Sequence, residues 1–433
     1  MSDTPPARAS AAFLSSDFRR YQLARVMVII GAEAQALAVA WQIYLITHSA
    51  IDLGYTGLAL FLPGLLFMLP SGHVADRFDR RHIILVCYSI QVFCTVALFL
   101  FALHHTRRIL PIYAVLFVIG SGRAFSGPAS AALIPHLVPK EHFVNAVTWG
   151  ATIFQIAIIS GPAIGGLLFT LPLHGSIAGA PIVYLFTFVT LIWFLVLVSS
   201  LSVRPGRMEY RAASLHVLLA GFRYVKSTPI LLGSITLDLF AVLLGGAVAL
   251  MPIFAQDILH AGPRGLGILR AAPAAGALVV SFWLTRWPIK RRAGAFMLVC
   301  VGIFGVATVL FGLSKNIVFS LIALVVVGAS DMVSVVIRSS ILQLATPQEM
   351  RGRVSAVSSL FLGASNELGE FESGLTAQWW GAVRAVIYGG IGSLIVTGLW
   401  AVLFPQLRDA QELTAEALLN VEALESGRDV QKL

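Results

Sequence analysis

Residues 354–380 read VSAVSSLFLGASNELGEFESGLTAQWW, a stretch that suits a membrane span except for the three carboxylates of Glu367, Glu370 and Glu372. A charge at the centre of a bilayer costs at least about 2.5–3.5 kcal/mol on insertion scales. Such groups are retained where they face a cavity, a partner charge or a proton path. This stretch therefore predicts a membrane helix that serves transport and does more than anchor the chain.

The rest of the chain has the composition of a membrane protein. Of its 433 residues, 58% are apolar and 12% are charged, whereas soluble proteins have about 25% charged residues. Apolar runs long enough to cross about 30 Å of hydrocarbon recur along the chain, and backbone groups in lipid must be paired within each segment, so these runs predict helices. We expect twelve spans, near residues 21–47, 51–74, 82–103, 111–135, 143–171, 181–203, 229–256, 263–285, 293–313, 316–340, 354–380 and 383–404.

Lysine and arginine are distributed unevenly between the two sides of these spans. If both termini are cytoplasmic, 21 of the 30 basic residues fall in cytoplasmic segments, 5 in outer loops and 4 within spans. Cytoplasmic loops of membrane proteins carry such an excess. The sequence therefore predicts an integral membrane protein with both termini inside. The same loops account for the net charge of +9 without nucleic-acid binding.

A basic segment at 204–228 divides the expected spans into six and six. Leu215, Leu218, Leu219 and Phe222 can share one face of a helix there, so we expect an amphipathic helix on the cytoplasmic leaflet. The expected division is a cytoplasmic tail at 1–20, a six-helix bundle at 21–203, the connector at 204–228, a second six-helix bundle at 229–404 and a cytoplasmic tail at 405–433.

The two halves show a weak internal repeat at an offset of 208 residues. At this offset Gly161 aligns with Gly369 and Gly166 aligns with Gly374. The fifth expected span thereby falls on the eleventh. Parallel repeats about an axis along the membrane normal characterise one large class of secondary transporters.

The loop after the second expected span reads GHVADRFDRR at residues 72–81. It resembles the signature G-x-x-x-D-R-x-G-R-R/K between spans two and three of the major facilitator superfamily, with Asp79 in place of the second glycine. The resemblance implies two bundles of six transmembrane helices, and a charge network near the end of the eleventh span that holds the outward-open state. We also expect Asp76 to lie near the start of the next helix, where a carboxylate is favoured. The expected cytoplasmic gate comprises Gly72, Asp76, Arg77, Arg80 and Arg81.

The fifth expected span contains AIISGPAIGG at residues 157–166. It is similar to the antiporter motif G-x-x-x-G-P-x-x-G-G of exporters in this superfamily, with alanine at the first position. Proline bends a helix, and glycines allow close packing against a neighbouring span. A packing seam without a role in coupling is the alternative. The residues of the seam are Gly161, Pro162, Gly165 and Gly166.

Ionisable residues are concentrated in particular spans. In the superfamily fold, spans one, four, seven and ten line the cavity and spans three, six, nine and twelve form the outer ring. The latter four have no acidic or basic residue in their interiors here. The expected proton-coupling and substrate cavity comprises Glu33, Arg123, Asp238, Arg270, Asp331, Glu367 and Glu370.

Glu367 and Glu370 are three residues apart and share a helix face. A carboxylate that alternates between an apolar setting and a position beside arginine can take up and release a proton. We expect both glutamates to pair or compete with Arg270, assisted by Asp238 or Asp331. Static ion pairs between helices are the alternative.

The first half is expected to use Glu33 and Arg123 as its counterpart. The side chain of Glu372 lies about 200° around the helix from that of Glu370, so we expect a structural ion pair for Glu372. Arg338 ranks lower as a candidate because it is placed near the cytoplasmic end of its span, where its side chain could reach the membrane surface.

Other stretches resemble the siderophore exporters of this superfamily. The resemblance implies a bacterial inner-membrane exporter that moves a siderophore-, drug- or metabolite-like molecule by proton antiport and alternating access. We expect a monomer whose partners are this molecule, protons and membrane lipid, with no nucleic acid, cofactor or metal. The stretches are Gln42-Ile43, Thr47-His48-Ser49, Ala75-Asp76-Arg77, Leu219-Ala220-Gly221-Phe222-Arg223, Leu342-Gln343 and Thr346-Pro347.

Three other classes of protein remain open. A lipid or lysolipid flippase of the same fold would differ in its substrate. A membrane-embedded enzyme is less well supported, because the sequence has no His-Glu-x-x-His and no Gly-x-Ser-x-Gly pattern. It also lacks the phosphate-binding Gly-x-x-x-x-Gly-Lys-Ser/Thr, which argues against ATP as the energy source. A receptor or scaffold would not need buried acids in both halves.

Overall fold

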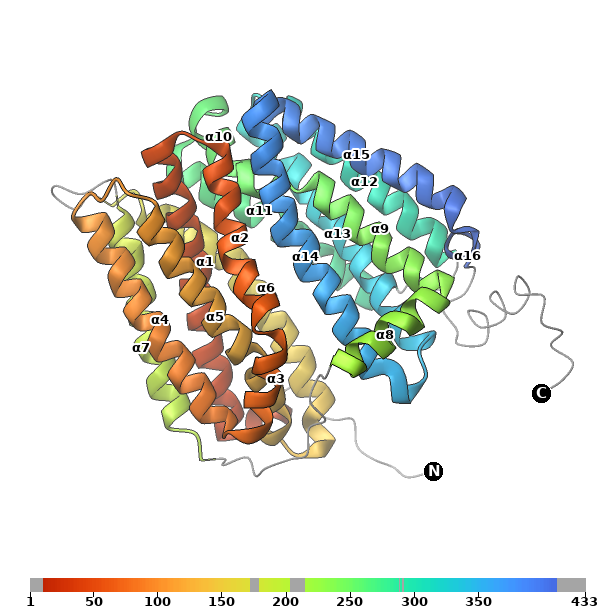
Figure 1. Ribbon diagram of the computed structural model, residues 1–433, viewed down its shortest axis with the longest axis horizontal. Coiled ribbons are helices and arrows are strands. Elements are labelled where there is room, and N and C mark those ends of the chain that lie inside the picture. Colours follow the sequence, from red (N-terminus) through yellow and green to blue (C-terminus); the bar gives the residue numbers. More distant parts are fainter. Residues whose placement is uncertain (1–10, 172–178, 203–214, 288, 290–291, 411–433) are drawn as a thin grey trace, which may run out of the picture. The chain divides into compact units, whose positions relative to one another are not determined.

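The computed structural model describes residues 11–171, 179–202, 215–287, 289 and 292–410. All regular structure within these ranges is helical (Figure 1). Parts of both predicted tails and the first part of the connector lie outside the described residues. The prediction of an all-α membrane protein is confirmed.

Ten helices in the described part are long and apolar enough to cross a membrane. The helix α2 (Ala50–Leu66) is apolar but has 17 residues. It continues almost without a break into α3 (Met68–Arg77), because the amide of Phe67 still donates to the carbonyl of Pro63. The helix α14 (Gln348–Trp380) has 33 residues and carries the three glutamates. A count of twelve spans therefore stays a prediction that depends on α2 and α14.

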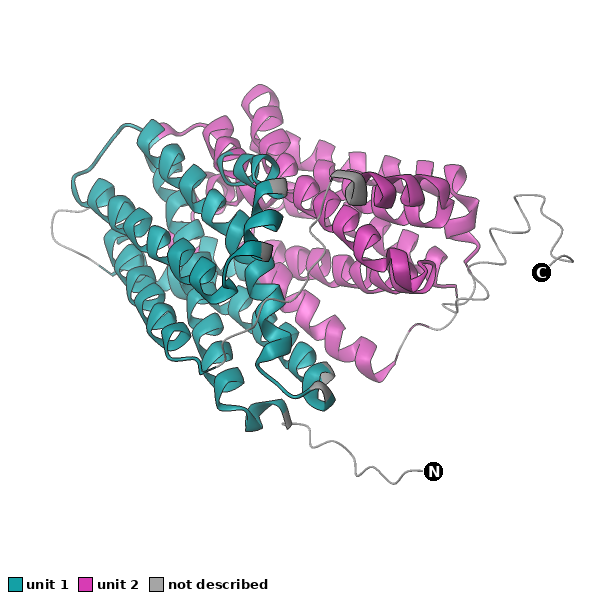
Figure 2. Cartoon of the chain, turned by 60° about the horizontal axis from the view of Figure 1, so that its bottom comes forward, with its two compact units in different colours: residues 1–46, 59–212, 266–271 teal, residues 47–58, 213–265, 272–433 magenta. Residues whose placement is uncertain are grey.

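The helices form two compact units (Figure 2). Unit 1 comprises residues 1–46, 59–212 and 266–271, and unit 2 comprises residues 47–58, 213–265 and 272–433. The helices that lie wholly or almost wholly in unit 1 are η1 (Ala11–Leu14), α1 (Ser16–Thr47), α3, α4 (Arg80–Leu103), α5 (Leu110–Leu133), η2 (Ile134–His136), η3 (Lys140–His142), α6 (Phe143–Leu168) and α7 (Ala180–Ser199).

Unit 2 holds most of the remaining helices. The start of α2 is grouped with unit 2 and residues 266–271 of α11 are grouped with unit 1, so each of these two helices is divided between the units. The helices of unit 2 are α8 (Leu215–Ser227), α9 (Pro229–Gly245), η4 (Val248–Leu250), α10 (Met251–Ile253), η5 (Phe254–Ile258), α11 (Gly262–Arg286), α12 (Ala293–Leu313), α13 (Ile317–Leu344), α14, α15 (Ala382–Leu403) and α16 (Pro405–Arg408).

Each unit has its own apolar core. In unit 1, Tyr21 of α1 is buried with Ile84 of α4 and Phe194 of α7. In unit 2, Leu231 of α9 is buried with Ile337 of α13. The lipid-facing surface is also apolar, so close packing and satisfied polar groups must hold the helices together, rather than apolar burial alone.

The seventh expected span is interrupted. The helix α9 ends at Gly245, and the chain then passes through η4, α10 and the π-helical turn η5 to Ile258. An unpaired carbonyl in this region would be costly. The hydroxyl of Ser373 in α14 donates to the carbonyl of Gly246 over 2.6 Å and thereby closes the break.

The internal repeat is visible in helix contacts. A Cβ atom on Gly120 of α5 would lie 2.5 Å from the carbonyl oxygen of Leu60 in α2. Gly328 of α13, 208 residues later, meets the carbonyl of Pro273 in α11 in the same way. The α2–α5 pair in the first half and the α11–α13 pair in the second half therefore pack together in the same way, with a glycine against the backbone of the other helix.

The connector contains a helix where the sequence predicts one. In α8, the hydroxyl of Tyr224 donates to the carbonyl of Ala345 over 3.0 Å, and the ring of Phe222 stacks on that of Phe361 of α14. The side chain of Leu219 is exposed. The placement of α8 on the cytoplasmic leaflet and the proposed domain boundaries stay predictions.

Candidate functional site

A buried ion pair joins two helices inside unit 2. Asp238 of α9 pairs with Arg338 of α13, and their side chains are 3% and 7% exposed, respectively. Removing two charges from water is costly unless each has a partner. This pair corrects the low rank that the sequence gave to Arg338, whose guanidinium is buried in the protein instead of reaching the membrane surface.

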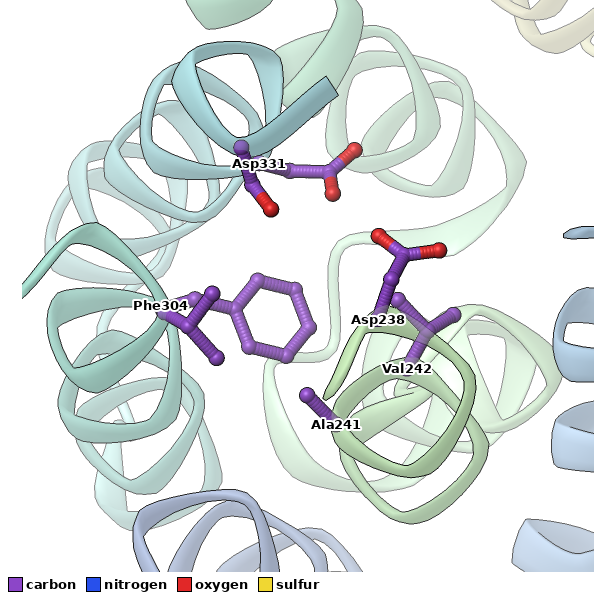
Figure 3. Close-up of a pocket in the computed structure, with 7 residues that line it drawn as sticks. Asp238, Ala241, Val242, Phe304 and Asp331 are labelled. Carbon is purple, nitrogen blue, oxygen red and sulfur yellow. The ribbon is translucent and has the colours of Figure 1, made fainter. Parts of the chain in front are cut away.

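A small cavity adjoins this ion pair. Its wall includes Asp238 from α9, Phe304 from α12, and Asp331 and Ser334 from α13. The carboxylates of Asp238 and Asp331 lie toward the same space (Figure 3). The two predicted acids of unit 2 are therefore brought together, and Arg338 lies beside them. Ser334 is a member of this cluster that the sequence did not single out.

The glutamates of α14 have close helix neighbours. A Cβ atom on Gly57 of α2 would lie 2.8 Å from a carboxylate oxygen of Glu370, so the absence of a side chain there makes room for the glutamate. Glu367 is half-buried. Glu372 is also half-buried, and no ion pair is found for it among the described residues, contrary to expectation.

Arg270, the expected partner of these glutamates, is grouped with unit 1, as are Glu33 and Arg123, the expected counterpart in the first half. Arg270 lies in the segment of α11 that is grouped with unit 1, and its Nη1 atom is buried without a hydrogen-bond partner in the described part of the chain. Glu33 is half-buried and Arg123 is exposed. No ion pair between Glu33 and Arg123 is found within the described ranges. Their coupling roles stay predictions.

The glycines of α6 form two adjacent contact faces. Gly161 meets the side chain of Glu33 in α1, and a Cβ atom on Gly165 would lie 2.8 Å from the Cα atom of Ala34. Pro162 and Gly166 meet a second helix, because a Cβ atom on Gly267 of α11 would lie 2.6 Å from the carbonyl oxygen of Pro162 and 3.0 Å from the Cα atom of Gly166. Both faces have the i, i+4 spacing of a helix.

The aligned glycines of α14 make matching contacts in unit 2. A Cβ atom on Gly369 would lie 3.1 Å from the carbonyl oxygen of Leu243 in α9. One on Gly374 would lie 2.9 Å from the Cα atom of Gly54 in α2. The predicted seam of α6 is thus a close-packing site, and the aligned glycines of α14 form an equivalent site in unit 2. The role of the seam in coupling stays a prediction.

The cations of the expected gate bind carbonyl groups at helix ends. Arg80 is buried, and its Nη1 atom donates to the carbonyl of Ala132 over 3.2 Å and contacts Nε2 of His136 at 2.9 Å. Arg81 donates to the carbonyl of Ser199, the last residue of α7, and to the carbonyl of Leu201, two residues further on. Cations are favoured at such carboxyl ends. Gly72 and Arg77 lie on α3. The Asp76 side chain is outside the described residues, so the charge network stays a prediction.

The residue at the start of α4 differs from the expectation. Asp76 lies in the last turn of α3, and Asp79 is the N-cap of α4, where its carboxylate accepts from the amide of Arg81 over 2.9 Å. Its φ of −60° suits any residue, so the position does not require the glycine of the family signature. The aspartate provides a helix cap that glycine lacks.

This cap leads to a prediction with a built-in comparison. Asp79→Ala should lower the free energy of unfolding by about 1 kcal/mol, whereas Asp79→Gly should cost only a few tenths of a kcal/mol relative to aspartate. Thermal unfolding of the purified variants measures both changes. Equal losses for alanine and glycine would show that the carboxylate does not act as a cap.

Comparison with known proteins assigns the family. A family model described as transmembrane secretion effector matches residues 7–429. The chain belongs to this family. The protein is a transporter of the major facilitator superfamily rather than an enzyme, as the sequence predicted.

Two relatives of this protein are exporters. The chain is 28% identical over 383 residues to the enterobactin exporter EntS of Shigella dysenteriae serotype 1 (strain Sd197). This alignment covers 87% of the chain and 86% of the relative. The enterobactin exporter EntS of Escherichia coli O81 (strain ED1a) matches with the same identity and coverage.

Solved structures show the same fold at low sequence identity. A mutant of the nucleoside transporter NupG aligns with a TM-score of 0.70 and 11% identity, over 90% of this chain and all of that one. A bacterial homologue of the human lysosomal transporter Spinster, in an inward-facing unoccupied conformation, aligns with a TM-score of 0.66 and 16% identity, over 96% and 99% of the two chains. These likenesses support the fold alone.

Proposed function

We propose that this protein exports an organic small molecule of the siderophore class, driven by proton antiport. The observation that carries the proposal is the similarity to enterobactin exporters along 87% of the chain. Because the similarity extends through both halves, it covers helices that would line a substrate cavity as well as the loop at residues 72–81. The proposal includes drug-like and other metabolite substrates, and uptake measurements with each class of compound distinguish them.

Proton antiport is supported by ionisable groups at membrane depth. Asp238 and Asp331 line one cavity in unit 2, and Glu370 lies against Gly57. Acids inside spans characterise proton relays and ion pathways in transporters. The Asp238–Arg338 pair also supplies the arginine next to which a carboxylate can give up its proton.

The excess of basic residues in alternate loops supports cytoplasmic termini, in the inner membrane of a bacterium. In this orientation Arg80 and Arg81 are on the cytoplasmic side and His105 is on the outer side. Alkaline phosphatase fused after His105 should be active, and phosphatase fused after Ser227 should be inactive. The reverse pattern would invert the topology.

Transport can be tested in inside-out vesicles from cells that lack their own siderophore exporter. Vesicles with this protein should accumulate enterobactin when their interior is acidified, and a protonophore should abolish the accumulation. Glu349→Gln, which changes an exposed carboxylate of α14, is the control and should transport normally. Uptake that is unaffected by the protonophore would contradict proton antiport.

The same vesicles separate the two remaining substrate classes. Labelled phospholipid is the second probe, and it should not cross faster in vesicles with the protein than in empty vesicles. Rapid phospholipid transfer without siderophore uptake would replace the exporter proposal with the flippase alternative.

A further inference from the structure

The cavity in unit 2 combines acidic groups with an unpaired hydroxyl. Ser334 is 2% exposed, and its Oγ atom has no hydrogen-bond partner in the described part of the chain. It lines the same cavity as Asp331, three residues earlier on α13. A buried hydroxyl without a partner is costly. Because the hydroxyl of Ser334 lies at the wall of a cavity, a small polar molecule in that cavity could supply the missing hydrogen bond.

The size of the cavity limits what it can hold. Its volume is about 10 Å³, which is near the lower limit for a single water molecule. Asp238, Asp331 and Ser334 provide polar groups on its wall, and a buried water typically makes about three hydrogen bonds. This volume is too small for a substrate molecule and suits only a water or an ion of similar size.

The charges of the cluster favour a proton over a metal ion. Asp238 is already paired with Arg338, so Asp331 is the acid left without an ion-pair partner among the described residues. Asp331 is half-buried, and an ionised carboxylate at the wall of a cavity is unfavourable unless a cation or a proton neutralises its charge. Hard metal cations take about six or more oxygen ligands, and the guanidinium of Arg338 would repel them.

Within the described part of the chain, Asp238 and Asp331 are the charged residues that line this cavity. The wall from α12 is apolar, with Val301 and Phe304. The helix α14 also packs against α9, at Gly369, and its glutamates do not line the cavity. The proton balance therefore depends on Asp238, Asp331 and Arg338.

We propose that this cavity is a proton-binding site, in which one water held by Ser334 bridges Asp331 and Asp238, and Asp331 gains and loses the proton. Arg338 compensates the charge of Asp238 through their ion pair. The cluster is neutral when Asp331 is protonated and carries one negative charge when it is not. This inference rests on the proton-driven export proposed above, and it locates one proton site in unit 2 rather than on α14.

Infrared spectroscopy of the purified protein tests the site without any transport measurement. A protonated carboxyl group in a dry site gives a separate C=O band that shifts in D₂O and disappears as the pH rises. We expect Asp331→Asn to remove this band. Asp331→Glu should retain a carboxyl band at a shifted frequency, which shows that the helices still assemble. The control Glu349→Gln should leave the band unchanged.

Ser334→Ala tests the water. We expect it to change the band frequency and to move the midpoint of the titration by about one pH unit, since one hydrogen bond is lost. An unchanged band together with a higher melting temperature would mean a dry cavity and overturn the bridging water. A band that persists in folded Asp331→Asn, or that is abolished by sodium at constant pH, would overturn the proton site.

The two proposals can fail separately. If the infrared band behaves as expected but a protonophore does not affect siderophore uptake, the proton site is supported and proton-driven export is contradicted. Protonophore-sensitive uptake by a protein without an Asp331 band would support proton-driven export and contradict the proton site at Asp331.

Discussion

Arg338→Leu should abolish proton-driven uptake and lower the free energy of unfolding by about 3–5 kcal/mol, because it leaves the carboxylate of Asp238 buried without its partner. The pair is almost fully buried, so water cannot screen the unpaired charge. This loss is a large fraction of the about 5–15 kcal/mol that stabilises an ordinary domain. Thermal unfolding in detergent and vesicle uptake measure the two effects.

The double variant Asp238→Asn/Arg338→Leu separates structure from coupling. Replacing both partners of a buried ion pair is often nearly neutral for stability, so most of the lost stability should return while proton-driven uptake stays absent. Full recovery of uptake would mean that the pair is a static link between α9 and α13. Arg408→Leu is the matched control, since Arg408 pairs with Asp409 at the exposed end of the same unit and should change little.

Gly165→Ala should reduce uptake strongly and cost about 1–3 kcal/mol, the usual effect of adding a methyl group to a fully packed contact. Its Cβ atom would lie 2.8 Å from the Cα atom of Ala34, and backbone cannot rotate away as a side chain can. The helix α6 must then move away from α1. Size-exclusion chromatography and thermal unfolding report stability, and vesicle uptake reports function.

Gly127→Ala is the matched control for this substitution. It adds the same methyl group to a helix of the same unit at a position where nothing lies within 4 Å of the new atom. We expect normal uptake and unchanged or slightly higher stability, since alanine favours helix more than glycine. If both alanine variants lose uptake equally, close packing at the seam is not the cause.

The sequence predicted features that lie within one helix better than features that join two. Apolar length predicted the helices, and the depth of Asp238 and Asp331 in their spans indicated that both are internal. The partner of Asp238 was ranked low, because sequence gives the position of Arg338 along its own helix but not the rotation of α13 against α9. An arginine near a helix end can reach the membrane surface or turn inward, and only the neighbouring helix decides.

Local chemistry produced the other differences. Asp79 caps α4 through a bond to an amide two residues away, and the motif resemblance drew attention to Asp76 instead. Ser334 is unremarkable in sequence, because serines are common in membrane helices, and it acquires interest through the cavity beside it. By contrast, the glycine pairs at the 208-residue offset indicated close packing correctly, because two helices can approach closely only where the residues between them are small.

The matching contacts of α6 and α14 have a consequence for how the two halves differ. Gly161 and Gly369, which align at the 208-residue offset, both lie at close contacts between helices. The next residue is Pro162 in one helix and Glu370 in the other. The two halves therefore share a packing framework, but at the same level of that framework one half has a helix-bending proline and the other has an ionisable group.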